Sequence, residues 1–289
     1  MENSIPAYPE SQVSVLKQQT PFPPFLRWAG GKRWLVHDIL EMIGDVPIRT
    51  YYEPFLGGGS VFFGIQPEGK AVLSDLNTDL ITVYRQIRDN PNRIADLLMR
   101  YKNTPECYYS ARANKPTNDD EISAWFIFLN HTSYNGIFRV NLKGEYNVPY
   151  GKRKYVHMPD RDFLTRASHI LQGVELYDRS FEISLKTVSE GDLVFLDPPY
   201  TVAHNNNGFV KYNQHLFSFN DQQRLAKSIE RIIEKRAKFI LTNAAHTSID
   251  ELFSPLGRRI EVSRRNAVGG LKANRGKTTE YLFTNLGEK

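Results

Sequence analysis

The stretch LVFLDPPY, Leu193–Tyr200, decides which fold the chain can adopt. Its four consecutive apolar residues, LVFL, are typical of a strand that is buried on both faces of a parallel sheet. The strand must end at Asp197, because neither of the two prolines that follow can donate a hydrogen bond to a sheet ladder. Open α/β sheets bind ligands at the carboxyl ends of their strands. The stretch therefore predicts a ligand site in which Asp197, Pro198 and Tyr200 present a carboxylate, a carbonyl group and an aromatic ring.

These three groups suit the exocyclic amine of a flat base, which offers two N–H donors and a face for stacking. The alternative is structural, a Pro-Pro turn that closes a core strand with the Tyr200 ring packed inside the protein. The segments described below favour the ligand site.

The composition leaves room for a large globular enzyme. The 289 residues include 37 lysines and arginines and 32 aspartates and glutamates, a net charge of +5 that favours a polyanionic partner only weakly. With 40% hydrophobic residues, the chain can build one large domain or two. A single cysteine, Cys107, excludes an internal disulfide and a cysteine-rich metal site. Apolar runs stay below the ~20 residues of a membrane span and no signal peptide is visible, so a soluble, cytoplasmic protein is expected.

The segment FLRWAGGK, Phe25–Lys32, resembles a phosphate-binding loop but lacks its defining residues. A P-loop requires a glycine where this chain has Leu26 and a serine or threonine where it has Arg33, so a nucleotide triphosphatase is excluded. What remains is Trp28 beside a glycine turn and the start of a helix, a setting for an aromatic or anionic ligand. The alternative is a structural turn with a core tryptophan.

A second glycine-rich segment, YYEPFLGGGSVFFG at Tyr51–Gly64, is typical of a strand that runs through a glycine turn into a helix. Such a turn lets backbone N–H groups approach a ligand at the first crossover of a doubly wound sheet. The dinucleotide fingerprint is incomplete, because the third glycine expected after Gly57 and Gly59 is missing. About 20 residues further on, Asp75 ends a second strand, where it can accept hydrogen bonds from ribose hydroxyls. The alternative is a simple helix N-cap at Asp75 or Asn77, followed by an amphipathic helix at Leu80–Ile87.

The pattern changes near residue 90, where helical stretches at 92–102 and 122–129 are separated by polar sequence. Residues 131–154 then alternate aromatic and basic side chains, and their Asn-Gly and Lys-Gly-Glu sequences predict hairpin turns. Basic groups can neutralise phosphates while aromatic tips wedge into or stack on bases. A solvated basic hairpin is the structural alternative. A second basic hairpin is expected at 264–277, which contains five basic residues and no acid.

In this order, FLRWAGGK, EPFLGGGS, LSDLN, a basic insertion and DPPY resemble the Dam-type N6-adenine DNA methyltransferases of the D12 class, alpha group. The resemblance runs from Phe25 to Leu286. It implies a Rossmann-like α/β sheet that binds S-adenosyl-L-methionine (AdoMet), with an inserted, mainly helical target-recognition domain that carries a β-hairpin. The domains expected on that plan are a flexible arm at 1–24, a catalytic AdoMet-binding domain at 25–78 and 160–289, and a target-recognition domain at 79–159.

The resemblance also implies roles for individual residues. The catalytic motif would be Asp197, Pro198, Pro199 and Tyr200, with Tyr200 stacked on the flipped-out base. The residues that would bind the cofactor are Trp28, Ala29, Gly30, Lys32, Glu53, Pro54, Phe55, Gly57, Gly59, Asp75 and Asp197. The residues that would contact DNA are Arg27, Tyr134, Asn135, Ile137, Arg139, Asn147, Pro149, Lys152, Arg264 and Arg265.

Within the recognition hairpin, Tyr134 would wedge into the base stack, Asn135 would fill the vacated space, and Arg139 would read a guanine edge in the major groove. Arg27 departs from the family pattern, which often has lysine before the tryptophan at a position implicated in reading the first guanine of the target. The expected target is GATC or a GATC-like site, and this departure leaves the exact sequence open.

The expected function is methyl transfer from AdoMet to N6 of an adenine in double-stranded DNA, with no metal required. The nearest alternative is an AdoMet-dependent amine methyltransferase acting on RNA, since a protein amide substrate would call for asparagine in place of Asp197. A non-enzymatic DNA-binding module with a relic cofactor fold, and a nuclease, are alternatives from other classes. The expected enzyme acts as a monomer without membrane contact, and a restriction endonuclease is its candidate functional partner.

Overall fold

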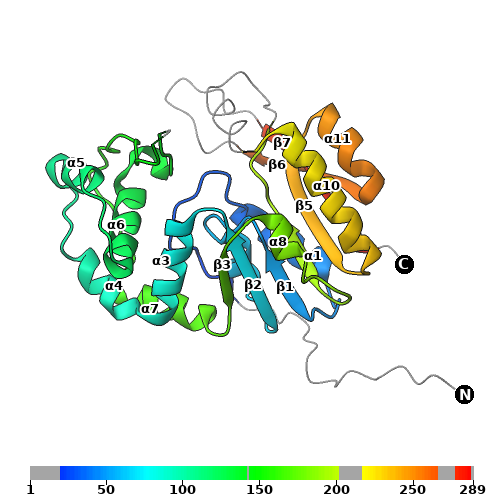
Figure 1. Cartoon of the computed structure of the whole chain (residues 1–289), viewed down its shortest axis with the longest axis horizontal. Helices are drawn as coiled ribbons and strands as arrows, with labels where there is room; N and C mark the ends of the chain where they lie inside the picture. The colour runs from blue at the N-terminus through cyan, green and yellow to red at the C-terminus, as the bar shows by residue number, and fades with distance from the viewer. Residues whose placement is uncertain (1–19, 142, 202–216, 266–276, 288–289) are drawn as a thin grey trace, which may run out of the picture.

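The protein is described by a computed structural model that covers residues 20–141, 143–201, 217–265 and 277–287. A seven-stranded sheet lies at its centre, with the strand order β3-β2-β1-β4-β5-β7-β6 (Figure 1). The first five strands of that order pair in parallel, whereas β7 is antiparallel to both β5 and β6. The predicted Rossmann-like α/β class is therefore confirmed. The strands are β1 (Thr50–Glu53), β2 (Lys70–Asp75), β3 (Glu175–Asp178), β4 (Leu193–Leu196), β5 (Lys238–Ala244), β6 (Arg258–Arg265) and β7 (Lys277–Thr284).

The direction in which the sheet grows reverses between β1 and β4. Strands β1, β2 and β3 step outward to one edge, and the chain then returns to place β4 on the other side of β1. Open sheets bind ligands beside such a switch point, at the carboxyl ends of the strands. Those ends of β1 and β4 carry the glycine turn and the DPPY motif.

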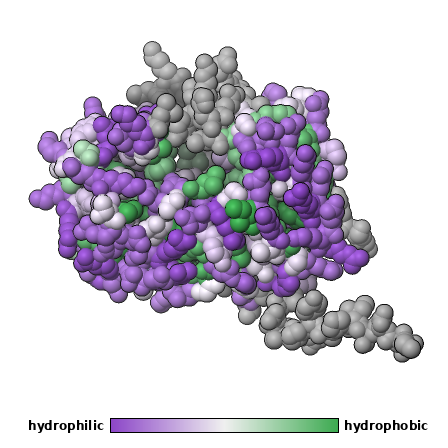
Figure 2. Space-filling view, in the orientation of Figure 1, coloured by the Kyte–Doolittle hydropathy of each residue, from purple (hydrophilic) through white to green (hydrophobic). Residues whose placement is uncertain are grey.

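Helices cover both faces of the sheet, with α10 and α11 on the β5 side and α3 to α7 on the β3 side (Figure 1). Among the described helices, none combines the length and the apolar character that crossing a membrane requires. On the face shown in Figure 2, hydrophilic residues cover most of the described surface and apolar residues appear in small groups. The helices and 3-10 turns are η2 (Arg33–Leu35), α1 (Val36–Ile43), α2 (Ser60–Ile65), α3 (Thr78–Asp89), α4 (Pro91–Leu98), α5 (Pro105–Ala113), α6 (Asp119–Thr132), η3 (Tyr134–Gly136), α7 (Arg161–Leu171), α8 (Phe181–Leu185), α10 (Phe219–Glu234), α11 (Thr247–Phe253) and η4 (Ser254–Leu256).

Strand β4 is buried on both faces, as its four apolar residues predict. Leu193 and Phe195 belong to a large apolar cluster with residues of α1 and α3, whereas Val194 and Leu196 belong to a second cluster with residues of α8 and α10. Successive side chains of a strand point to opposite faces of the sheet. This run therefore joins the two halves of the core and fixes the position of Asp197 directly after it.

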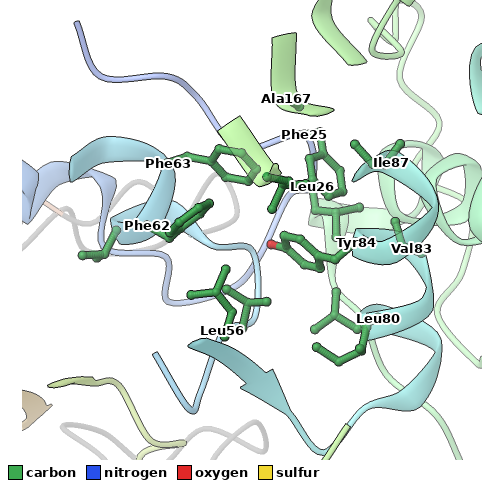
Figure 3. Packing of buried hydrophobic residues seen from close by; sticks show 14 of the residues in the cluster. Phe25, Leu26, Leu56, Phe62, Phe63, Leu80, Val83, Tyr84, Ile87 and Ala167 are labelled. Atoms are coloured by element: carbon green, nitrogen blue, oxygen red, sulfur yellow. The ribbon is translucent and has the colours of Figure 1, made fainter. Parts of the chain in front are cut away.

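The large cluster also holds the glycine turn in place. Tyr84, on α3, is fully buried beside Phe25 and Phe63, with ring centroids 4.9 and 6.4 Å away (Figure 3). Its hydroxyl donates a 3.0 Å hydrogen bond to the carbonyl of Gly57. A buried tyrosine hydroxyl needs such a partner, so the packing of the core and the position of the turn are coupled.

Helices α4 to α6 lie between β2 and β3 in the sequence. Helix α4 packs against α3 and α7, α6 packs against α3 and α4, and α5 packs against α6. The helices predicted at 92–102 and 122–129 are confirmed as α4 and α6, although α4 already ends at Leu98. Helix α5 was not predicted, because its polar residues show little apolar periodicity. The buried residues of this helical segment belong to the same cluster as the sheet, and the domain boundaries near 79 and 160 stay a prediction.

The two turns predicted in 131–154 have different outcomes. The turn at Lys143–Gly144 is confirmed, since Val140 and Tyr146 form an isolated antiparallel bridge around it. The prediction of a hairpin turn at Asn135–Gly136 is wrong, because this segment forms the 3-10 turn η3. Its residues have the left-handed φ angles, 57° and 64°, that Asn-Gly sequences favour, but α6 runs up to Thr132 and no strand precedes the turn.

Two other predictions fall partly outside the described residues. Of the arm predicted at 1–24, residues 1–19 lie outside the described residues. Phe22 is buried, and its ring centroid lies 5.8 Å from that of Phe63 and 4.8 Å from that of Phe163. Packed structure therefore begins before Phe25. In the second basic hairpin, β6 and β7 pair up to Arg265 and its partner on β7. The tip of this hairpin, residues 266–276, lies outside the described residues.

Candidate active site

Asp197 follows directly on β4 and is contacted from two sides. Thr242, on the neighbouring β5, donates a 2.7 Å hydrogen bond to the Oδ1 atom of Asp197. The Nζ atom of Lys32 lies 2.8 Å from Oδ1 and 3.0 Å from Oδ2. The Asp197 side chain is 21% exposed and that of Lys32 only 2%. The carboxylate therefore reaches the surface at the carboxyl end of the sheet, and the lysine contacts it from the protein side.

Tyr200 and Glu280 complete this cluster. The Tyr200 hydroxyl donates a 2.7 Å hydrogen bond to Oε2 of Glu280, on β7, and Nζ of Lys32 lies 3.6 Å from the same oxygen. Nζ also lies 4.9 Å from the centroid of the Tyr200 ring. One ammonium group thus contacts two carboxylates and an aromatic face, an environment that favours a nitrogen carrying positive charge.

Burial is the largest influence on the pKa values of Asp197 and Tyr200. It raises the pKa of Asp197, whereas the Lys32 ammonium and the Thr242 hydroxyl act in the opposite direction. It also raises the pKa of Tyr200 well above its ordinary value, and the charges of Asp197 and Glu280 add to that effect. Tyr200 therefore stays protonated and donates to Glu280, whereas the ionised form of Asp197 acts only as an acceptor.

The turn between β1 and α2 packs closely against Trp28. A Cβ atom at Gly57 would lie 2.6 Å from Nε1 of Trp28, and one at Gly58 would lie 2.8 Å from the Cβ atom of Trp28. Gly57 and Gly59 also have φ angles of 47° and 64°, which glycine adopts without strain. Only glycine therefore lets this main chain approach the indole so closely.

Asp75, at the end of β2, holds the other side of the glycine turn. Its Oδ2 atom accepts a hydrogen bond from the Gly57 amide and its Oδ1 atom one from the Asn77 amide, each of 3.0 Å. Burial raises the pKa of Asp75, and these amides oppose the increase. Helix α3 is capped by the Asn77 side chain, which accepts from the Leu80 amide. The cap predicted at Asp75 or Asn77 is therefore confirmed at Asn77. Asp75 itself is not the cap, and its oxygens keep lone pairs for a ligand hydroxyl.

Glu53 ends β1 and is 2% exposed. Its Oε2 atom accepts hydrogen bonds from the Tyr51 hydroxyl at 2.7 Å and from the Phe62 amide at 3.0 Å. Burial raises the pKa of Glu53 to about 8, against the effect of the Tyr51 hydrogen bond and with a further increase from the charge of Asp197. Glu53 is therefore largely protonated at neutral pH, and a cationic ligand group beside it would favour the ionised form.

The other residues predicted to bind a cofactor differ in their surroundings. Ala29 and Gly30 are exposed, whereas Pro54 is buried. The ring of Phe55 packs on Phe181 with centroids 5.3 Å apart. The Phe55 side chain thus packs in the second apolar cluster. A contact of Phe55 with a ligand would therefore be made by its main chain.

A second group of predicted residues gathers where the FLRWAGGK segment meets η3. The Asn130 side chain accepts from the Arg27 amide and donates to the Arg27 carbonyl, both at 2.8 Å, and also donates to the Gly136 carbonyl at 3.3 Å. A Cβ atom at Gly136 would lie 2.8 Å from the Cβ atom of Arg27. Tyr134, 51% exposed, and the exposed Asn135 belong to the same turn. Main-chain contacts thus bring Arg27 next to the turn that carries Tyr134 and Asn135.

Four more predicted residues follow η3 in the chain. The Nε atom of Arg139 donates a 2.8 Å hydrogen bond to Oδ1 of Asn147, across the Lys-Gly turn. This contact orients the guanidinium plane. Ile137 is half-buried, and Pro149 is exposed.

Trp28 connects the two groups. Its ring stacks on Phe138, with centroids 5.8 Å apart and an interplanar angle of 14°. Phe138 precedes Arg139 in the chain, and Trp28 also packs against the glycine turn. The residues predicted for the cofactor and those predicted for DNA therefore meet at one tryptophan.

Three predicted residues are not joined to these groups by a described contact. Lys152 is exposed, with a φ angle of 53°. Arg264 and Arg265 end β6, where their main chains pair with residues of β7. Their contact with DNA stays a prediction.

Three residues of the cluster were not predicted from the sequence. Glu280 and Thr242 contact Tyr200 and Asp197, and the Gln222 side chain donates hydrogen bonds to the Pro199 carbonyl at 3.5 Å and to Thr201 at 3.0 Å. Glu280 had a signal, because it is an acid at the start of the apolar run YLF in a strand. Gln222 and Thr242 had none, since their contacts come from other elements of the fold.

Two other features lie away from the cluster. His37, Asp38 and Glu41 bring possible metal ligands together on the exposed face of α1, an arrangement common on protein surfaces without an ion. A hollow lined in part by Pro47 and Arg236 lies at the amino ends of β1 and β4, opposite the DPPY motif. The metal-ligand group is exposed, and the hollow contains one buried carboxylate, Asp192, whose oxygens accept hydrogen bonds from Arg49. The expectation that no metal is required stays a prediction.

Known proteins similar to this chain include several DNA methyltransferases. The Type II methyltransferase M1.LlaDCHI of Lactococcus lactis subsp. cremoris is 33% identical over 275 residues, which are 91% of this chain and 95% of the relative. The Type II methyltransferase M.MjaIII of Methanocaldococcus jannaschii is 36% identical over 242 residues, 76% of this chain and 84% of the relative. The DNA adenine methylase of Salmonella typhi is 30% identical over 264 residues, 89% of this chain and 93% of the relative.

The family model described as D12 class N6 adenine-specific DNA methyltransferase matches residues 28–268. This range includes the first glycine-rich segment from Trp28 onward, the whole of the second, the helical segment and the DPPY motif. The predicted resemblance is thus confirmed, and the chain belongs to the D12 class N6 adenine-specific DNA methyltransferases.

Proposed function

We propose that this enzyme transfers a methyl group from AdoMet to N6 of an adenine flipped out of duplex DNA, at GATC or a GATC-like site. The observation that carries the proposal is the position of the Lys32 Nζ atom, between the Asp197 carboxylate and the Tyr200 ring. A flat base with an exocyclic amine can use the same two groups, the carboxylate as an acceptor and the ring as a stacking partner.

The chemistry follows from the weakness of the nucleophile. The lone pair of the adenine amine is delocalised into the ring, so the amine attacks poorly. Asp197 would accept a hydrogen bond from one N–H group and the Pro198 carbonyl from the other, which localises the lone pair. The carboxylate would also stabilise the positive charge that develops on N6, so this interaction is stronger in the transition state than in the ground state.

Tyr200 would receive the base. Extruding a base from the duplex costs roughly a few kcal/mol in lost stacking and pairing. The hydrogen bond to Glu280 orients the Tyr200 ring in advance, and stacking on it would offset part of that cost. The Gln222 side chain donates a 3.5 Å hydrogen bond to the Pro199 carbonyl, a contact that would help to position the turn of the motif.

The glycine turn suits AdoMet. Because Gly57 has no side chain, its main chain packs directly against Trp28, and no side chain protrudes at this point. Asp75 can accept hydrogen bonds from ribose hydroxyls. We assign AdoMet to Trp28, Gly57, Gly59 and Asp75, with Glu53 near its cationic end. When bound, AdoMet supplies a methyl group activated by a sulfonium.

We assign target recognition to the surface formed by Arg27, η3 and the Lys-Gly turn, within a recognition domain at 79–159. Tyr134 and Asn135 are exposed there, as a wedge and a space-filling residue must be. The net charge of +5 agrees with binding to a polyanion.

The experiment compares wild type with Asp197→Ala on unmethylated plasmid DNA and labelled AdoMet. We expect Asp197→Ala to abolish methyl transfer, because it removes the acceptor for the amine, while DNA affinity stays within about twofold of wild type. Asp197→Asn is the matched control, which keeps the volume but loses the charge and should also be strongly impaired. Near-normal turnover by Asp197→Ala would exclude the proposed mechanism.

Structured RNA in the same assay tests the alternative substrate. Methylation of RNA without methylation of DNA would overturn the proposal. Sequencing of the modified DNA, with methylated adenines identified, determines the target and decides for or against GATC.

A further inference from the structure

We propose that Glu280 is a positioning residue of the target-base site, which orients Tyr200 and receives the Lys32 ammonium when the adenine displaces it from Asp197. The inference rests on the proposed function. It is carried by the contacts of Glu280 with Tyr200 and Lys32, which join a buried carboxylate on β7 to distant parts of the chain.

Lys32 lies where the adenine amine must go. Its Nζ atom is 2.8 and 3.0 Å from the two oxygens of Asp197 and 4.9 Å from the centroid of the Tyr200 ring. The proposed function gives both groups to the target base. The lysine and the base therefore compete for the same place, and the lysine must leave Asp197 before methyl transfer.

A displaced ammonium needs a new partner, because an unpaired charge in a buried place is costly. The Lys32 side chain is 2% exposed and that of Glu280 is 1% exposed, so water supplies little compensation. The Oε2 atom of Glu280 is already 3.6 Å from Nζ, just beyond hydrogen-bond distance. A small rotation of the flexible lysine chain brings the two atoms into contact, while Nζ can keep its 2.8 Å hydrogen bond to the Gly30 carbonyl.

The position of Glu280 is fixed by the sheet. Its main chain pairs with Ala244 of β5 on one side and Val262 of β6 on the other. The Tyr200 hydroxyl, 2.7 Å from Oε2, orients the carboxylate further. Glu280 therefore offers a rigid second position for Lys32, and the Asp197 carboxylate becomes available to the adenine amine.

Glu280→Gln tests this inference, since glutamine keeps the volume and an oxygen that can accept from Tyr200 but loses the charge that would receive Lys32. The substrate is a duplex with 2-aminopurine at the target adenine of the site that sequencing identifies, and its fluorescence reports the flipped-out base. We expect Glu280→Gln to lower this signal and to slow single-turnover methylation roughly tenfold, the effect of losing one charge-assisted contact. AdoMet affinity measured by calorimetry should stay within about twofold.

Lys32→Met provides the decisive comparison. If the Lys32 side chain blocks the base by staying on Asp197, Lys32→Met in the Glu280→Gln background should restore the 2-aminopurine signal. If Glu280 has a purely structural role, the second substitution should not restore it. Glu261→Gln, on the exposed neighbouring strand β6, is the matched control and should behave as wild type.

The outcomes separate the two proposals. Unchanged flipping and methylation in Glu280→Gln, or a double variant no better than Glu280→Gln, overturns the role of Glu280 and leaves the proposed function intact. A wild-type protein that neither methylates DNA nor raises the 2-aminopurine signal overturns both.

Discussion

The charge of Asp197 depends on groups that act on it in opposite directions. Burial raises its pKa, and the contacts with Lys32 and Thr242 limit that increase. A protonated Asp197 no longer carries the negative charge that would favour a cationic N6 in the transition state. Methyl transfer should therefore decline on the acid side, as the pH falls through the raised pKa of this carboxyl group.

We expect Thr242→Val to move this acid limb to higher pH. The variant keeps the branched shape of the side chain but removes a 2.7 Å hydrogen bond to the ionised form of Asp197, which raises the pKa further. The measurement is the single-turnover rate as a function of pH for both proteins. Thr187→Val, whose hydroxyl lies next to that of Tyr52, is the control and should leave the limb in place. A limb unchanged in Thr242→Val would show that this hydroxyl does not set the charge of Asp197.

The sequence predicted the position of Asp197 but not its environment. Two prolines after an apolar run force the strand to end, and this local rule places the carboxylate at the sheet edge. Its partners come from elsewhere in the fold, Lys32 from the first glycine-rich segment and Thr242 from β5. No local pattern states which side chains of distant elements will meet.

Among the elements, the glycine turn after β1 is the most constrained. Gly57 combines a φ angle of 47° with an approach to Trp28 that leaves no room for a Cβ atom. The sequence predicted the turn from its glycines, but the partner against which it packs became visible only in the structure.

We expect Gly57→Ala to weaken AdoMet binding by roughly tenfold, about 1.4 kcal/mol, because the added methyl group would push Trp28 away from the glycine turn. Gly144→Ala is the matched control, since Gly144 also has a positive φ, 77°, but nothing within 4 Å of a Cβ atom. Both variants carry the backbone strain, and only the first carries the steric clash. Calorimetric titration measures the affinities for AdoMet. Equal affinities in the two variants would show that Trp28 does not contribute to the cofactor site.

The predictability of the elements follows their length and apolar periodicity. Strand β4 and helix α3 were predicted because each has a clear pattern of buried residues. Helices α8 and α11 were missed, since segments of 5 and 7 residues are stabilised by tertiary contacts more than by their own sequence. The N-terminus of α10 is capped by Ser218 in a capping box with Asp221.

In the molecule as a whole, the helical segment and the sheet share one large apolar cluster. The family resemblance implied an inserted recognition domain, and the change in composition agreed with it, but neither specifies which helix faces meet. The stack of Trp28 on Phe138 shows how closely the two parts approach. The predicted chemistry and the predicted reading of DNA are thus neighbours in space while they use different residues, so variants should affect them separately.

We expect Arg139→Ala to relax the choice of target sequence and Lys152→Ala to weaken DNA binding evenly. Arg139 is held by a 2.8 Å hydrogen bond to Asn147, and an oriented guanidinium can bind a guanine edge through two hydrogen bonds. Its loss should cost ~1–3 kcal/mol at one base pair and little elsewhere. Lys152 is exposed, and a single phosphate contact should lower the salt dependence of binding by about one charge without changing sequence preference.

The measurement that distinguishes the two roles is binding to a set of duplexes, each with one substitution in the target, at several salt concentrations. A base-reading residue changes the order of affinities among the duplexes, since it contributes only where its partner base is present. A phosphate-binding residue shifts all affinities together and changes their slope with salt. If Arg139→Ala preserves the order and changes the slope instead, the Asn147 hydrogen bond orients this arginine toward the backbone of the duplex, and reading of the guanine must be assigned to another residue, with Arg27 next to η3 the first to test.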